Sequence, residues 1–87
     1  MIVKQLKTND IFVFGSNTEG RHGAGAAKLA MQFGANYGQP LGRQGQTYAI
    51  VTKDLKTGFV GWDIVVAQLK LFVIYAKNNP NLTFLLT

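Results

Sequence analysis

The segment that decides the fold runs from Phe12 to Lys28 and reads FVFGSNTEGRHGAGAAK. It opens with apolar residues that are typical of a buried strand. Glycines at positions 15, 20, 23 and 25 then predict a loop, and an alanine-rich stretch from about Ala24 to Phe33 predicts a helix. A helix that begins on a glycine loop offers free backbone N–H groups and the positive end of its dipole. The segment therefore predicts a place to hold a phosphate.

The rest of the chain supplies two more predicted strands and one more predicted helix. The three strands are expected at Ile11–Phe14, Thr47–Thr52 and Leu82–Leu86. Between the last two, residues 62–77 predict a helix whose buried stripe is expected to hold Val65, Leu69, Phe72, Val73 and Ala76. Segments 34–46 and 53–61 are rich in glycine and polar residues and are predicted to be loops. The order β-α-β-α-β predicts a small α/β domain, a parallel three-stranded sheet in three layers.

Length and composition limit the class of protein. Eighty-seven residues predict one domain, spanning 1–87, and the absence of cysteine excludes disulfides and thiolate metal sites. The net charge of +5 favours anionic partners, although spread-out lysines and arginines are also typical of a solubilising surface. The chain starts without a signal-peptide pattern, and the apolar run at residues 71–76 is too short for a membrane span. We expect a cytoplasmic protein without membrane contact.

Polar residues gather where the first two strands end. Loops after parallel strands leave from one edge of a sheet, so these residues are expected to line one crevice. Arg21 suits a phosphate, and Asn17 suits a ribose hydroxyl or a carbonyl. Tyr37 and Tyr48 are candidate stacking faces, although Tyr48 also fits the core. The predicted ligand-binding residues are Gly15, Ser16, Asn17, Gly20, Arg21, His22, Gly23, Ala24, Gly25 and Lys53.

Residues with catalytic chemistry are few. Asp54, after the second strand, is the candidate general base, and the alternative is a loop cap paired with Lys53 or Lys56. His22 is the only histidine, and a single exposed loop histidine usually has no catalytic role. Together with four carboxylates it predicts neither a metal site nor a further cofactor. Trp62 is expected to cover the core at the start of the second helix.

Four sequence blocks resemble one family. They are Phe12-Val-Phe-Gly-Ser-Asn17, Gly20-Arg-His-Gly-Ala-Gly-Ala-Ala-Lys28, Gly42-x-x-Gly-Gln-x-Tyr48-Ala-Ile-x-Thr52-Lys-Asp54, and Asn79-Pro80 followed by Leu82-Thr-Phe-Leu. These blocks resemble small macro-domain-like proteins of bacteria and phages. The resemblance implies an α/β fold that binds ADP-ribose, and in some members hydrolyses ADP-ribose linkages. It places Asn17 and the turn from Gly23 to Ala26 at the family's ligand site.

The chain also departs from that family. Macro domains are typically about twice as long, and their second glycine-rich phosphate loop follows a strand that resembles Leu82–Leu86. By this resemblance the chain is either a minimal version of the fold, completed by a dimer partner, or a product truncated before that loop. The family's acidic contact to adenine would be either Asp10 or absent from this chain. A three-stranded sheet leaves apolar edges uncovered, so we expect a homo-oligomer.

Two other classes of function fit the sequence. One is a basic nucleic-acid-binding protein, which the net charge and the loop residues Tyr37, Arg43 and Lys53 favour. The other is a small phage or bacterial interaction module whose sheet edge pairs with a partner.

Overall fold

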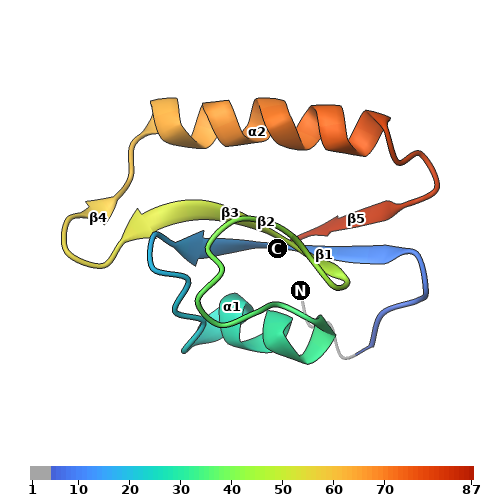
Figure 1. The fold of residues 1–87 in the computed structure, drawn as a ribbon, viewed down its shortest axis with the longest axis horizontal. Helices are drawn as coiled ribbons and strands as arrows, with labels where there is room; N and C mark the ends of the chain where they lie inside the picture. The colour runs from blue at the N-terminus through green and yellow to red at the C-terminus, as the bar shows by residue number, and fades with distance from the viewer. Residues whose placement is uncertain (1–4) are drawn as a thin grey trace.

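A computed structural model describes residues 5–87 as one sheet between two helical layers (Figure 1). The strands are β1 (Asp10–Asn17), β2 (Gly42–Gln44), β3 (Thr47–Asp54), β4 (Gly58–Phe59) and β5 (Thr83–Leu86). The helices are α1 (Gly25–Ala30), a short 3₁₀ turn η1 (Met31–Phe33) and α2 (Trp62–Lys77). The predicted α/β class is confirmed, and the three predicted strands correspond to β1, β3 and β5.

The sheet is mixed, with β1 at its centre. Its order is β2-β3-β1-β5, and β1 pairs in parallel with both β3 and β5. The prediction of an entirely parallel three-stranded sheet is wrong, because β2 and β4 pair antiparallel with the two ends of β3. Both added strands come from segments predicted to be loops. They form because β3 continues to Asp54 and the chain folds back beside it at each end, where two or three residues suffice to pair.

The core lies between the sheet and α1. Phe12 and Phe14 are two residues apart on β1, so both side chains point to the same face of the sheet. There they pack with Ala30 and Ala49. Phe33 meets the ring of Phe12 edge-on, with centroids 5.6 Å apart. The small alanine side chains let α1 approach β1 closely, and this contact sets the position of the glycine loop between them.

Helix α2 covers the opposite face, and the predicted buried stripe is correct for Val65, Phe72 and Ala76 but wrong for Leu69 and Val73. Val65, Gln68, Phe72 and Tyr75 face the sheet, and the Gln68 side chain bonds both the N–H and the carbonyl of Val51 at 2.7 Å. Leu69 and Val73 are therefore exposed on the flank of α2.

Trp62 lies on that same flank. It is 74% exposed and packs edge-on against Phe59, so the expectation that it covers the core is wrong. Helical periodicity explains its position, because Trp62, Leu69 and Val73 follow one another at seven- and four-residue spacing. Among residues 5–87, no helix is both long enough and apolar enough to cross a bilayer.

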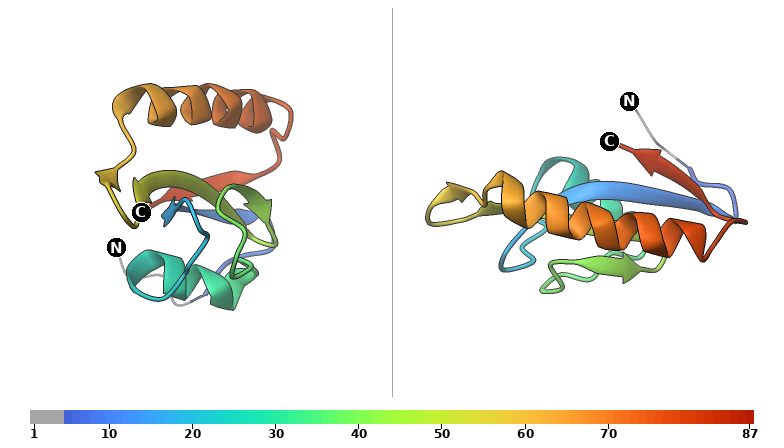
Figure 2. Two further views of the ribbon diagram at one scale, coloured as in Figure 1. Left: turned by 60° about the vertical axis from the view of Figure 1, so that its left-hand side comes forward. Right: turned by 90° about the horizontal axis from the view of Figure 1, so that it is seen from above.

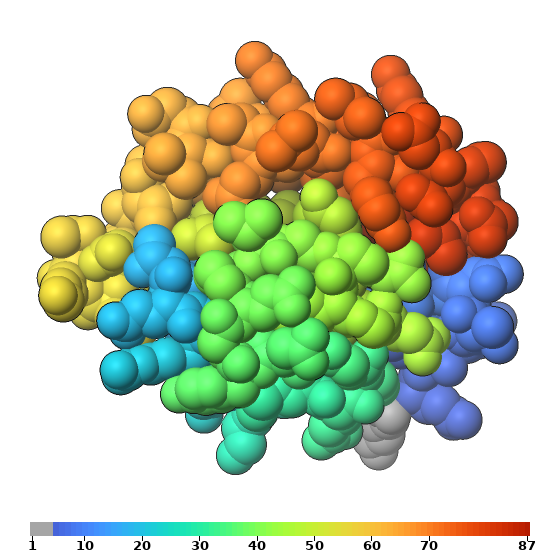
Figure 3. All heavy atoms as spheres, viewed as in Figure 1, coloured from blue at the N-terminus to red at the C-terminus, as the bar shows by residue number. Residues whose placement is uncertain are grey.

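The segment with β2 closes the front of the molecule, between α1 and α2 (Figure 3). Two glycines allow its close approach to η1. Gly34 (φ 112°) and Gly45 (φ 56°) lie in contact, and a Cβ added to Gly45 would lie 2.8 Å from the Cα of Gly34. Next to this contact, the Gln46 N–H donates to the carbonyl of Phe33 at 2.8 Å.

We predict that Gly45→Ala destabilises the fold more than Gly38→Ala does. Both glycines have positive φ, so both substitutions carry the left-handed backbone penalty of about 1–2 kcal/mol. Only Gly45 also has backbone atoms within 3 Å of the added Cβ, whereas Gly38 faces open space. Urea unfolding of the two variants measures the difference. Equal losses of unfolding free energy would contradict the close packing of Gly34 and Gly45.

Candidate functional site

An open pocket of about 490 Å³ lies where β1 and β3 end. Both strands run toward this edge because they pair in parallel, from Phe12 opposite Thr47 to Asn17 opposite Lys53. The prediction that the loops after these two strands meet is therefore confirmed. The pocket is lined by Gly15, Ser16, Asn17, Arg21, Gly23, Ala24, Ala27, Tyr37, Thr52, Lys53 and Leu55. Seven of the ten predicted ligand-binding residues line it; Gly20, His22 and Gly25 do not.

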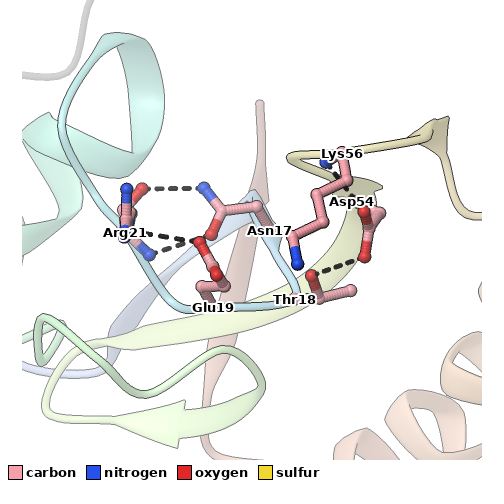
Figure 4. Close-up of polar contacts among 6 residues, drawn as sticks. All are labelled: Asn17, Thr18, Glu19, Arg21, Asp54 and Lys56. Carbon is pink, nitrogen blue, oxygen red and sulfur yellow. Dashed lines mark hydrogen bonds and ion pairs between the residues drawn. The ribbon is translucent and has the colours of Figure 1, made fainter.

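Asn17 organises the loop on one side of the pocket. Its Nδ2 donates to the carbonyl of Arg21 at 2.8 Å, and its Oδ1 accepts from the Arg21 N–H at 2.9 Å (Figure 4). A shift in the β1–β3 register between Ser16 and Asn17 accompanies this turn. Because its amide group is engaged with backbone, Asn17 acts on the pocket by fixing where Arg21 and the residues after it lie.

Arg21 and Lys53 are the cations that line the pocket, and both are exposed. The Nε of Arg21 lies 3.2 Å from a carboxylate oxygen of Glu19 (Figure 4). An exposed ion pair of this kind contributes little free energy, so the guanidinium can exchange this partner for another anion. Its two terminal NH₂ groups form the planar fork that suits a phosphate.

The glycines of the loop have different roles. Gly20 is buried against the segment around Gln39, where an added Cβ would lie 2.6 Å from backbone atoms, so its role is packing. Gly25 begins α1 with φ 59°. Gly23 lines the pocket, has no positive φ, and an added Cβ would meet nothing within 4 Å. Gly23 is thus the position where absence of a side chain leaves the pocket open.

His22 differs most from its prediction. We expected an exposed loop histidine, and the structure buries the ring completely. It packs edge-on against Phe14 at 5.3 Å and against Tyr37 at 6.3 Å between ring centroids. Neither ring nitrogen has a hydrogen-bond partner within the described residues. The hydrogen bonds between Asn17 and the backbone of Arg21 fix the turn just before His22, and the buried ring supports Tyr37 at the pocket wall.

The two tyrosines considered for stacking lie on opposite sides of the sheet. Tyr37 lines the pocket and is exposed. Tyr48 packs under α2 against Phe72 and Tyr75, which corresponds to the core alternative. Burial, and secondarily the neighbouring Tyr75, raise the pKa of Tyr48. Asp10, considered for an adenine contact, begins β1 at the end away from the pocket and accepts from the N–H of Lys7.

Asp54 caps the turn between β3 and β4. Its Oδ1 accepts the N–H of Lys56 at 2.8 Å, and its Oδ2 accepts the hydroxyl of Thr18 at 3.0 Å (Figure 4). The N–H of Thr57 also donates to Oδ1, at 3.1 Å. These bonds, the one from Lys56 first, lower the pKa of the carboxyl. They stabilise the ionised form, which makes Asp54 a weaker base. It does not line the 490 Å³ pocket.

Several lining residues were missed by the sequence analysis. Ala27, Thr52 and Leu55 reach the pocket from α1, from the end of β3 and from the turn after it. Ala27 had a signal, since it follows Ala24 by three residues on a predicted helix. Leu55 had none, because its position depends on the turn that Asp54 caps.

Comparison of the chain with protein-family models, with curated proteins and with solved structures found no match. The resemblance to macro domains thus depends on the sequence blocks alone.

We predict that Asp54→Ala destabilises the protein at pH 7 and has a smaller effect in acid. Because the folded-state pKa of Asp54 lies below its ordinary value of 3.8, its contribution is complete well above that pH. The contribution disappears as the pH falls from 3.8 through the lower folded value, so the two stability curves should converge there.

Urea unfolding of the wild type and the variant between pH 2 and pH 7, at pH steps of about one unit, measures this convergence. Thr18→Val is the matched control, since it removes one of the three capping bonds and should have the smaller effect. A stability difference that is unchanged between neutral and acidic pH would contradict the capping role.

Proposed function

We propose that this protein binds a phosphate-bearing nucleotide, with ADP-ribose as the first candidate, in the pocket at the ends of β1 and β3. The observation that carries the proposal is the combination of an open backbone position at Gly23 with two cations, Arg21 and Lys53, around one pocket. The position of the pocket supports it, because ligands of parallel α/β sheets bind beyond the carboxyl ends of the strands.

The size and lining of the pocket fit a ligand with one charged and one apolar part. Its volume of about 490 Å³ lies within the range of roughly 300–1,000 Å³ of small-molecule sites. Arg21 and Lys53 supply positive charge for phosphate groups. Ala24, Ala27 and Tyr37 supply apolar surface for a ring. A nucleotide carries both parts, whereas inorganic phosphate carries only the first.

Hydrolysis of an ADP-ribose linkage is a separate activity from binding. The Asp54→Ala variant tests whether Asp54 takes part in it. The capping bonds of Asp54 favour a structural role. On that interpretation Asp54→Ala lowers the melting temperature and leaves any release of ADP-ribose per folded molecule unchanged. A folded Asp54→Ala variant that still binds ADP-ribose but loses a turnover that the wild type has would instead identify a general base.

A thermal-shift series identifies the class of ligand. Binding to the folded state raises the melting temperature by mass action. We expect a rise with ADP-ribose, a smaller rise with AMP, and little change with inorganic phosphate at the same concentration. A rise only with a short single-stranded oligonucleotide would contradict the proposal and favour nucleic-acid binding. No rise with any of the four would also contradict it.

We predict that Gly23→Val abolishes binding of ADP-ribose and preserves the fold. The backbone of Gly23 is not in a left-handed conformation and faces open space, so valine fits without strain but fills the pocket. Titration calorimetry with ADP-ribose measures the affinity, and circular dichroism checks the fold. Ala26→Val is the matched control, since Ala26 is exposed on α1 and does not line the pocket. Unchanged affinity in folded Gly23→Val would eliminate this site.

We predict that Arg21→Ala weakens binding of ADP-ribose at least ~10-fold, because a hydrogen bond to a charged group contributes about 1.5–3 kcal/mol. The same calorimetry gives the ratio of dissociation constants. Lys28→Ala is the control, since it removes one positive charge from an exposed residue of α1 outside the pocket. Equal losses in the two variants would assign the effect to net charge, and Arg21 would then have no specific contact.

A further inference from the structure

In the part of the chain that the structure describes, no element covers the side formed by β5 and the flank of α2. Seen from above, β5 lies at one margin of the sheet, beside β1, while α2 crosses over the middle (Figure 2). Within residues 5–87 no strand pairs with the outer edge of β5. That edge therefore presents backbone N–H and carbonyl groups in the spacing that a further strand would match.

Apolar side chains continue from this edge onto the helix. The exposed residues are Val66, Leu69 and Val73 of α2 and Leu86 of β5, each 42–65% exposed. Leu69 connects the two parts, because it borders both the depression beside Leu86 and the one along the flank of α2. We call these four residues the α2–β5 patch.

The α2–β5 patch exists because the helix turns its polar Gln68 toward the sheet. Gln68 satisfies the N–H and the carbonyl of Val51, and this contact fixes the rotation of α2. With Gln68 inside, Leu69 and Val73 point to the flank. Exposure of several aliphatic residues together on one flank usually marks an interface.

We propose that the α2–β5 patch and the free edge of β5 form a twofold interface with a second copy of this chain, in which β5 pairs antiparallel with β5 and the two sheets become one. The proposal is independent of the nucleotide site, which opens at the ends of β1 and β3. Self-pairing fits the alternation of β5, since Phe84 packs toward α2 with Phe72 and Tyr75. A twofold axis through Leu85 sets Phe84 of each copy opposite Leu86 of the other, on the α2 side.

The exposed side chains of the patch fit a dimer interface. The four aliphatic residues of the patch are each 42–65% exposed and lie together, as the residues of a functional apolar patch do. A standard interface buries about 800 Å² on each partner, of which roughly 60% is apolar. The patch contributes to the apolar part of one half-interface, and strand pairing contributes polar contacts.

Light scattering of the purified chain at about 10–100 μM tests the proposal. A dimer with a dissociation constant of about 1 μM is largely formed at these concentrations. We expect twice the 9.5 kDa mass of one chain for the wild type. Val73→Glu should give the monomer mass, because it puts a carboxylate inside the interface. Leu71→Glu is the matched control and should remain a dimer, since Leu71 is also exposed but lies on the opposite flank, near Leu41 and Tyr48. A monomeric wild type, or a dimer that Leu71→Glu breaks and Val73→Glu does not, would overturn the proposal.

Cross-linking tests the pairing of β5 with itself. The chain has no cysteine, so a single introduced thiol forms a disulfide only between copies. Leu85→Cys places the two thiols at the proposed axis, within the Cα separation of about 4.4–6.8 Å that a disulfide needs. Under mild oxidation we expect a covalent dimer from Leu85→Cys and none from Leu71→Cys. Failure of Leu85→Cys to cross-link while Leu71→Cys does would overturn the arrangement.

Discussion

β1 and β3 run side by side in the same direction, from Phe12 opposite Thr47 to Asn17 opposite Lys53. Parallel strands require a crossover, which here contains the glycine loop, α1, η1 and β2. The pairing brings the loop after Asn17 next to Lys53, although the two are distant in sequence. The pocket, its cations and the support of Tyr37 by His22 all depend on this pairing.

The sequence predicts the main strands, the longer helix and the edge where the site forms. These features follow from local signals: apolar runs for β1, β3 and β5, and helical spacing for α2. The sequence did not predict β2 and β4. β2 contains Gly42 and β4 contains Gly58, both with positive φ. Pairing with β3, rather than the strand propensity of their residues, stabilises these two strands.

Local sequence patterns also did not predict the rotation of α2 or the burial of His22. Hydrophobicity ranks Leu69 above Gln68 for the buried stripe, yet the amide of Gln68 bonds both polar backbone groups of Val51. An apolar side chain there would leave these groups without that partner. For His22, two hydrogen bonds between Asn17 and the backbone of Arg21 fix the turn just before the ring. The orientation of α2 thus depends on a contact between separate elements, and the turn before His22 depends on one side chain that binds the backbone locally.

Amide NMR of the wild-type protein during titration with ADP-ribose tests the central claim most directly, because each N–H reports its own surroundings. The account predicts that the largest shift changes fall on the amides of Arg21, Gly23, Ala24 and Lys53, on the two sides of the pocket. Saturable changes confined to other parts of the chain, such as α2 and β5, or no changes at millimolar ADP-ribose, would contradict it.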